Sequence, residues 1–190
     1  MNIIKTGFSG LFILEPKVFK DERGYFFESF NNKIFTEAGI NVNFIQINES
    51  RSISGVLRGL HYQLEPYAQT KLIRVVLGEI LDVVVDIRNS SPTYGKWFKL
   101  LLSEDNKKQL LIPKGFAHGF TVKSPTAIVL YKTDNLYHPE SERGIIYNDK
   151  SLNIDWETGN SEIIISEKDK MLPLFGEAEK NFVFNSDPYP

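Results

Sequence analysis

The sequence predicts a mainly β protein, an antiparallel sandwich or jelly-roll barrel with a few short peripheral helices. About ten short segments rich in β-branched and aromatic residues are separated by Gly, Pro, Asn and Asp, which is the pattern of strands and turns. Long helices do not alternate with these segments, which argues against a doubly wound α/β fold. The 190 residues fit one domain and can bury a substantial core.

The clearest strand signal lies in the segment from residue 80 to residue 87. Period-2 alternation there places Leu81, Val83, Val85 and Ile87 on one face, and Asp82, Val84 and Asp86 on the other. In chain order the expected strands are Leu11–Glu15, Tyr25–Phe30, Asn43–Glu49, Val56–Gln63, Thr70–Leu77, Ile80–Ile87, Trp97–Leu102, Gln109–Ile112, Ala117–Lys123 and Ala127–Lys132.

Two short helices are expected beside these strands. One spans Asn32–Ala38 and ends at Gly39, and the other lies near Ser166–Lys170, where a serine followed three residues later by an acid resembles an N-cap. The chain has no internal repeat or linker. We therefore expect a single domain over residues 1–185, followed by a loose C-terminal tail at 186–190.

Composition excludes several classes of function. Twenty-two Lys and Arg against twenty-four Asp and Glu leave a net charge of −2, which gives no general affinity for nucleic acid or anionic membrane. The absence of Cys excludes disulfides, thiol nucleophiles and zinc–thiolate sites. No stretch approaches the roughly 20 apolar residues of a membrane span. We expect a soluble, cytoplasmic protein that binds neither nucleic acid nor membrane.

Some polar residues lie at strand positions of apolar parity. Lys71 shares a face with Ile73 and Val75, so it either reaches water at the mouth of the strand or points as a cation into a ligand cavity. Glu28 lies between two phenylalanines, where a solvated edge is the simpler explanation. Gln46 and Asn48 share a face and could present amide groups to a ligand.

The histidines raise the question of a metal. His61, in VLRGLHYQ, fits a buried structural group, half of a metal site or a base, and His118 follows a Pro-x-Gly turn. Metal-binding jelly rolls typically use a His-x-His pair, but Gln63 stands where the second histidine would be, and His138 lies in a loop. Two imidazoles without an obvious carboxylate make a poor divalent site, so no metal is expected.

Several blocks in register resemble the dTDP-4-dehydrorhamnose 3,5-epimerases. They run from about residue 8 to 175 and comprise DERGYFFESF (21–30), QINESRS (46–52), VLRGLHYQ (56–63), GEILDVVVDIRNSSPTYGKW (78–97), IPKGFAHGF (112–120) and ISEKDKMLP (165–173). The resemblance implies a metal-free jelly roll of the cupin type (a double-stranded β-helix) that forms a homodimer. It also implies an isomerase that needs no cofactor and acts on dTDP-4-dehydro-6-deoxy-D-glucose.

The same resemblance assigns roles to individual residues. His61 corresponds to the proton acceptor, Asp169 to its partner carboxylate and Tyr131 to the proton donor, and Lys71 matches the lysine of the site. The substrate contacts, some reaching across the dimer interface from the early strands, fall on Arg23, Glu28, Gln46, Ile47, Asn48, Arg58, Lys71, His118, Tyr137, Glu142 and Lys168.

This residue set suits the implied chemistry. A C4 ketone acidifies the hydrogens on C3 and C5, so epimerisation needs a base on one face, an acid on the other and a cation near the oxygen. Arg58 and Arg23 are candidates for the diphosphate. The sequence leaves open an epimerase of C3 or C5 alone, an epimerase of another nucleotide-linked 4-keto sugar, and a non-catalytic sugar-nucleotide-binding jelly roll.

Overall fold

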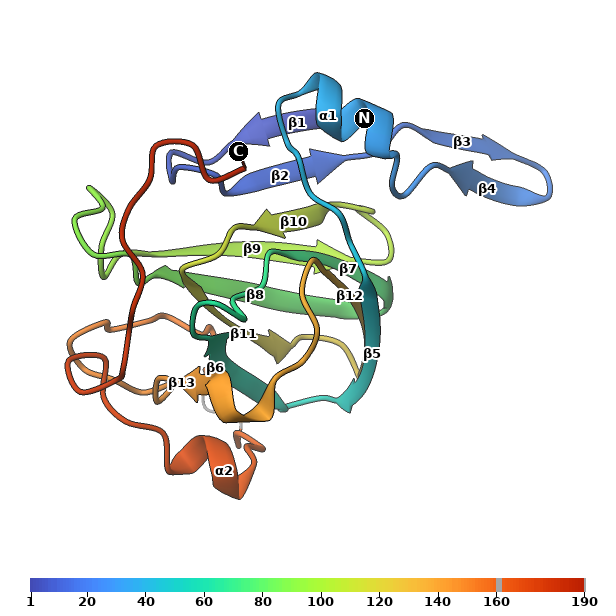
Figure 1. Cartoon of the computed structure of the whole chain (residues 1–190). Helices are drawn as coiled ribbons and strands as arrows, with labels where there is room; N and C mark the ends of the chain where they lie inside the picture. Colours follow the sequence, from blue (N-terminus) through green and yellow to red (C-terminus); the bar gives the residue numbers. More distant parts are fainter. Residues whose placement is uncertain (160–161, 190) are drawn as a thin grey trace.

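The protein is built from two antiparallel sheets that face each other, with a protruding hairpin (Figure 1). The computed structural model describes residues 1–159 and 162–189. One sheet has the strand order β1-β2-β10-β7-β12-β5 and the other β13-β6-β11-β8-β9, while β3 and β4 pair only with each other. The mainly β jelly-roll prediction is confirmed.

The elements have the following bounds: β1 (Asn2–Lys5), β2 (Phe12–Glu15), β3 (Val18–Asp21), β4 (Gly24–Phe27), α1 (Asn32–Glu37), β5 (Gln46–Ile53), β6 (Leu57–Gln63), β7 (Lys71–Leu77), β8 (Glu79–Asp86), β9 (Trp97–Ser103), β10 (Gln109–Ile112), β11 (Phe116–Val122), β12 (Thr126–Thr133), η1 (Pro139–Ser141), β13 (Glu142–Gly144) and α2 (Glu167–Lys170).

Strand β8 is buried on both faces, as its sequence alternation predicts. Val84 packs between the two sheets, in a cluster with Ile73 of β7 and Val129 of β12. Leu81 and Val83 belong to a second cluster, which the C-terminal part of the chain covers with Trp156 and other apolar residues. Because the five-stranded sheet is covered on both sides, a polar side chain on its inner face lies in the protein interior.

Both expected helices form and begin at side-chain caps. The Asn31 side chain accepts a hydrogen bond from the Lys33 amide at the start of α1, which ends before Gly39. The Ser166 hydroxyl accepts from the Asp169 amide at the start of α2. The cap of α2 therefore fixes the backbone of a predicted catalytic residue.

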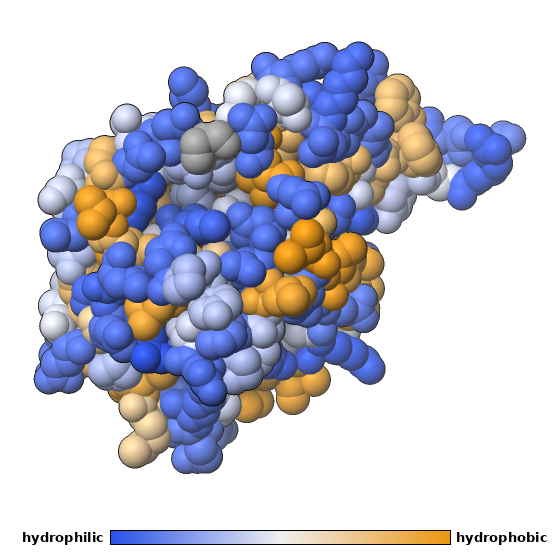
Figure 2. All heavy atoms as spheres, viewed as in Figure 1, coloured by the Kyte–Doolittle hydropathy of each residue, from blue (hydrophilic) through white to orange (hydrophobic). Residues whose placement is uncertain are grey.

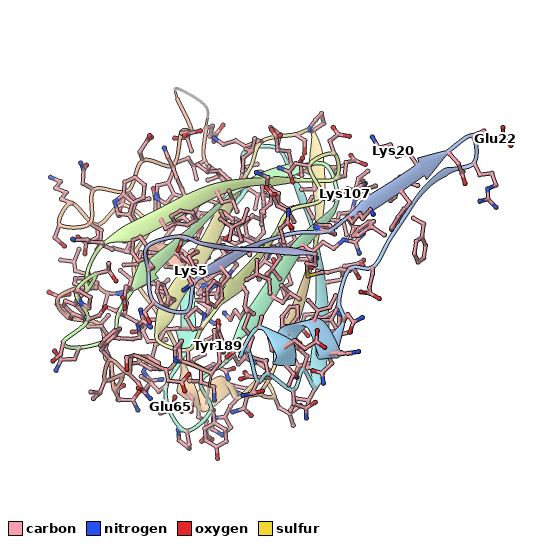
Figure 3. The ribbon with its side chains drawn as sticks, turned by 90° about the horizontal axis from the view of Figure 1, so that it is seen from above. Lys5, Lys20, Glu22, Glu65, Lys107 and Tyr189 are labelled. Atoms are coloured by element: carbon pink, nitrogen blue, oxygen red, sulfur yellow. The ribbon has the colours of Figure 1, made fainter. Side chains whose placement is uncertain are left out.

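The early part of the chain differs from the prediction. The expected strand Tyr25–Phe30 is shorter and forms the second arm of the β3–β4 hairpin, which extends away from the body with Glu22 at its tip (Figure 3). Glu28 lies beyond this strand, so it does not share a strand face with Phe26 and Phe30. The expected strand Asn43–Glu49 instead begins at Gln46 and continues to Ile53.

Three strands escaped prediction because they are short. β1 and β3 have four residues each and β13 has three, and they exist through pairing with β2, β4 and β6. The expected loose tail is wrong at Tyr189, whose buried hydroxyl donates to the Gly10 carbonyl at 2.6 Å. Pro190, also part of that prediction, lies outside the described residues. In Figure 1 the C-terminal segment runs from α2 back to β1 and β2.

The exposed surface combines a hydrophilic majority with local apolar areas (Figure 2). The hairpin exposes Phe19, Tyr25 and Phe26, the last with 70% of its surface accessible, and the edge strand β5 exposes Ile47 and Ile53. No helix in the described part of the chain is long and apolar enough to cross a membrane.

Candidate active site

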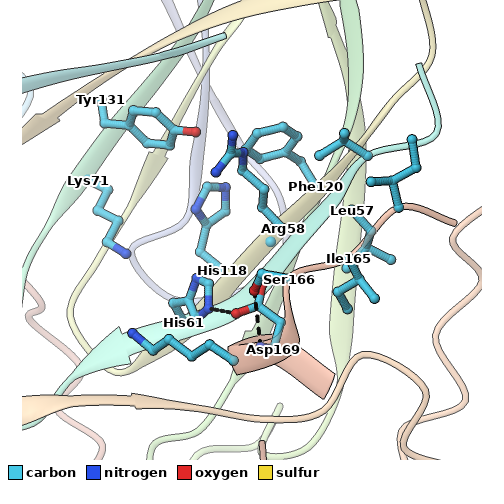
Figure 4. A pocket seen from close by; sticks show the side chains of 14 residues that line it. Leu57, Arg58, His61, Lys71, His118, Phe120, Tyr131, Ile165, Ser166 and Asp169 are labelled. Carbon is cyan, nitrogen blue, oxygen red and sulfur yellow. Dashed lines mark hydrogen bonds and ion pairs between the residues drawn. The ribbon is translucent and has the colours of Figure 1, made fainter. Parts of the chain in front are cut away.

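The predicted catalytic residues meet in one cavity of about 560 Å³ (Figure 4). Strands β6, β7, β11 and β12 and helix α2 with its N-cap contribute its polar lining, namely Arg58, His61, Lys71, His118, Tyr131, Ser166, Lys168 and Asp169. Leu57, Phe120, Ile164 and Ile165 add apolar wall. An adjoining cavity of about 180 Å³ shares His61, Lys71 and Tyr131 with the first and adds Asn48, Tyr137 and Glu142.

His61 and Asp169 form a hydrogen-bonded pair at one side of the cavity. Nε2 of His61 lies 2.8 Å from Oδ1 of Asp169. Burial opposes ionisation of this carboxyl, but the contact with His61 and a backbone N–H outweigh it, so the pKa of Asp169 is lowered. A neutral ring that donates from Nε2 keeps its lone pair on Nδ1, which is then the basic nitrogen.

Backbone geometry places the aspartate against β6. The Gly59 amide donates to Oδ2 of Asp169 at 3.2 Å. Gly59 has φ +114°, and a Cβ there would lie 2.6 Å from the Cα of Gly119. Because only glycine fits this backbone conformation and this approach of β6 to β11, the N–H that holds Asp169 depends on Gly59.

His118 has an aspartate partner that sequence reasoning missed. Its Nε2 lies 2.8 Å from Oδ2 of Asp82, which is fully buried on the inner face of β8. Burial raises the pKa of Asp82 against the opposing charges of His118 and Lys71. Within residues 1–159 and 162–189, Oδ1 of Asp82 has no hydrogen-bond partner. An acid in the middle of an apolar strand was the available signal.

Lys71 lies in the cavity rather than at the surface, so its place on an apolar parity reflects a charge pointing toward the interior. Burial lowers the pKa of Lys71 to about 8, although the negative charges of Glu142 and Asp82 oppose this shift. A partly desolvated ammonium group with few compensating contacts interacts strongly with any negative charge that develops beside it.

Tyr131 lies on the other side of the cavity from His61 and Asp169 (Figure 4). Its hydroxyl is 2.8 Å from the Ser50 hydroxyl on the neighbouring strand β5. Burial raises the pKa of Tyr131 to about 12, although the contact with Ser50 partly opposes the shift. The phenol is therefore protonated at neutral pH. Ser50 lies within a block that carries the family resemblance, but the sequence did not indicate its contact with Tyr131.

An ion pair and a phenol meet at the cavity mouth. The Tyr137 hydroxyl donates to Oε2 of Glu142 at 2.7 Å, and the Lys168 ammonium lies 2.5 Å from the same oxygen. Burial opposes ionisation of Glu142, but these two contacts outweigh it and its pKa is lowered. Glu142 thus connects the loop before β13 to helix α2.

Other predicted substrate contacts do not enter the cavities of their own chain. The described parts of the chain place Arg23 at the hairpin tip, 86% exposed and bonded to Asp21, and place Glu28 beside Asn31. Ile47 is exposed on β5. The Gln46 amide is engaged by protein groups, since its Oε1 accepts from the Tyr137 backbone and its Nε2 donates to Asn48.

The described residues hold no group of three or more His, Cys, Asp or Glu side chains arranged to bind a metal ion. His138, the remaining histidine, stacks on Tyr67 with the ring centroids 3.7 Å apart. Each of the three histidines is therefore in contact with a neighbouring carboxylate or ring.

Comparisons with known proteins point to one family. The family model described as dTDP-4-dehydrorhamnose 3,5-epimerase matches residues 5–177. The dTDP-4-dehydrorhamnose 3,5-epimerase of Shigella flexneri is 59% identical over 170 residues, covering 89% of this chain and 93% of that protein.

Solved structures give the same result. The crystal structure of dTDP-6-deoxy-D-glucose-3,5-epimerase from Legionella pneumophila, in complex with dTDP-4-keto-L-rhamnose, has a TM-score of 0.89 and 51% identity and covers 93% of each chain. A 3'-monoepimerase from Streptomyces bikiniensis, in complex with dTDP-quinovose, has a TM-score of 0.86 and 30% identity, covering 91% of this chain and 87% of that one. The chain belongs to the dTDP-4-dehydrorhamnose 3,5-epimerase family.

Proposed function

We propose that the protein epimerises dTDP-4-dehydro-6-deoxy-D-glucose at C3 and C5, giving dTDP-4-dehydro-L-rhamnose without a cofactor. Membership of the family gives the substrate class. The observation that carries the proposal is the arrangement of His61 and Tyr131 on opposite sides of one cavity that also holds the Lys71 cation. Inversion beside a ketone requires these three groups in this relation.

Each inversion proceeds by the same proton transfers. Nδ1 of His61 removes the proton from the carbon beside the C4 ketone, and the bonding electrons move to the ketone oxygen. Lys71 stabilises this enolate oxygen, and Asp169 stabilises the imidazolium that forms. Tyr131 delivers a proton to the opposite face of the carbon. The imidazolium and the phenolate then exchange protons with water, which restores both groups for the second centre.

The nucleotide part of the substrate requires cationic contacts. Arg58 lines the cavity, and its Nε donates to the Ser52 hydroxyl at 3.0 Å, which fixes the guanidinium side chain. A fixed guanidinium binds two phosphate oxygens at once, so we assign Arg58 to the diphosphate. Lys168, beside the mouth, is the second cation available to the phosphates.

We infer that the protein acts as a homodimer in which the early strands complete the partner's cavity. The inference is supported by the β3–β4 hairpin, which leaves the body (Figures 1 and 3). This hairpin exposes Phe19, Tyr25 and Phe26. Apolar surface of this kind is typical of a contact between chains. In a dimer Arg23 and Glu28 have a role that a single chain does not give them.

Incubation of the protein with dTDP-4-dehydro-6-deoxy-D-glucose in deuterated water tests the proposal. We expect deuterium at both C3 and C5 of the product, with and without prior treatment with a chelator. Label at one carbon supports mono-epimerisation, the reaction of the structurally similar 3'-monoepimerase from Streptomyces bikiniensis. No label, with binding of dTDP retained in a thermal-shift assay, indicates a non-catalytic binding protein. His61→Ala is the control for background exchange.

A further inference from the structure

Gln63 occupies the position where a metal-binding jelly roll would carry a second histidine, and its side chain is only 4% exposed. The amide group makes three hydrogen bonds. Nε2 donates to the Tyr67 carbonyl at 2.6 Å and to the Leu136 carbonyl at 3.2 Å, and Oε1 accepts from the His138 backbone N–H at 2.9 Å. All three partners are backbone groups, so the bonds hold main chain in place.

Two of these backbone groups flank Tyr137, one on each side. Gln63 therefore binds the main chain around Tyr137 as a neighbouring strand would. The Gln46 Oε1 accepts from the N–H of Tyr137 itself at 3.0 Å. Packing contributes little to holding this residue, since Tyr137 is 52% exposed. Its position consequently depends on two glutamine side chains and on its hydroxyl bond to Glu142.

We propose that Gln63 is a positioning residue that fixes Tyr137, and through it Glu142, at the mouth of the substrate cavity. The proposal rests on the proposed function and on the predicted contact of Tyr137 and Glu142 with the nucleotide sugar. Gln63 stands where a metal-binding jelly roll has a histidine ligand. In this protein the residue at that position, two residues from the base His61, instead organises the mouth of the substrate cavity.

The physical basis is the cost of leaving backbone groups unpaired. Methionine has nearly the length and volume of glutamine but can neither donate to the Leu136 and Tyr67 carbonyls nor accept from the His138 N–H. In Gln63→Met the loop at 134–141 regains its bonds only by moving toward water. Tyr137 then samples several positions, and the binding free energy of the substrate is reduced by the free energy needed to order it.

Hydrogen exchange tests the structural part of the proposal without any enzymatic assay. We expect faster amide exchange in a peptide covering residues 134–141 in Gln63→Met, detected by mass spectrometry. Asn181→Ala is the matched control because it removes an amide side chain that bonds the Glu65 backbone N–H and carbonyl in the loop after β6, without touching any group of residues 134–141. Unchanged exchange in Gln63→Met overturns the proposal.

Kinetics test the functional part. Gln63→Met should raise KM about tenfold with a smaller change in kcat, and Asn181→Ala should leave both near the wild-type values. In a Tyr137→Ala background the Gln63→Met change should add less than about twofold, because a residue that acts through Tyr137 has no effect once Tyr137 is gone. Full additivity of the two changes, or an unaltered KM, contradicts the role.

A second variant covers the case in which Gln63→Met does not fold. Gln63→Glu keeps the acceptor for the His138 N–H and loses both donors, so it should show the same rise in KM and the same exchange in 134–141. Failure of the proposed function is distinguishable: wild-type protein that introduces no deuterium into the sugar defeats the epimerase, while exchange in 134–141 still decides whether Gln63 holds the loop.

Discussion

His61 and His118 are directly paired residues of the neighbouring strands β6 and β11, and each imidazole is bonded to its own aspartate. Opposed residues of an antiparallel pair point to the same face, so both rings enter one cavity. Their partners differ: the pKa of Asp169 is lowered, whereas burial raises that of Asp82. His61 is thus the ring with the firmly anionic partner, which suits it to hold a proton taken from the substrate.

Replacement of the partner carboxylate should separate the two pairs. We expect Asp169→Asn to lower kcat by roughly 10²-fold or more, because the imidazolium loses its counter-charge, with little change in KM. Asp82→Asn should lower kcat less, since it removes a carboxyl whose ionisation burial already disfavours. Steady-state kinetics of the two variants measure the difference, and equal losses contradict the assignment of His61 as the base.

Asp169 also makes the fold sensitive to acid. Its pKa is lower in the folded protein than in the unfolded chain, so the unfolded state binds more protons in the range between the two values. The stability that the carboxylate contributes is complete above the unfolded pKa of about 4 and is lost as the pH falls through the lower folded value. Urea unfolding at pH 7 and near pH 3 should therefore show a smaller acid-induced loss in Asp169→Asn than in the wild type.

Tyr131→Phe should uncouple proton removal from inversion. His61 and Lys71 remain, so the variant can still form the enolate. His61 can then deliver deuterium from the solvent to the same face from which it removed the proton. We expect label in the recovered substrate while formation of epimer falls by roughly 10²–10⁴-fold. His61→Asn, the matched control, should lose both label and epimer. Equal loss of labelling in the two variants is the result that would exclude Tyr131 as the acid.

Lys71 links activity to pH and to stability. Because burial lowers its pKa to about 8, we expect kcat to fall as the pH rises above that value and the cation is lost. The folded state disfavours the charge, so Lys71→Met should increase the free energy of unfolding at pH 7 by on the order of 1–3 kcal/mol while nearly abolishing activity. This gain in stability should shrink between pH 8 and about 10.5, because in this range Lys71 of the wild type keeps its proton in the unfolded state but not in the folded state.

Sequence patterns predicted the parts of the fold that depend on local repetition. Alternation in the segment at 80–87 identified β8 and its two buried faces, since the pleat of a strand imposes that period. The three-residue strand β13 carries no such pattern and exists because β6 pairs with it. No local pattern predicts the burial of Tyr189 against Gly10, because this contact joins the two ends of the chain.

The candidate site shows the same division. Parity marked Lys71 as unusual, and the structure accounts for it by a cavity between the sheets. No local pattern connects His61 with Asp169, which are 108 positions apart, so that pair came from the family resemblance alone. Asp82, Ser50 and the loop contacts of Gln63 required three-dimensional placement, because each acts through a partner on another strand or loop.

Two serines of β5 offer a matched pair of substitutions. Ser50 contacts the Tyr131 hydroxyl and Ser52 accepts from Nε of Arg58, so neighbouring positions on one strand support the acid and the phosphate contact respectively. Loss of the Ser50 contact removes an influence that lowers the pKa of Tyr131, which makes the phenol a weaker acid. One neutral hydrogen bond contributes about 0.5–1.5 kcal/mol, so we expect Ser50→Ala to lower kcat roughly 2- to 10-fold.

Ser52→Ala should instead raise KM by a similar factor, because a freer Arg58 binds diphosphate less well. Steady-state kinetics of the two variants distinguish these effects, and a rise in KM alone for Ser50→Ala would show that Ser50 serves binding rather than proton transfer.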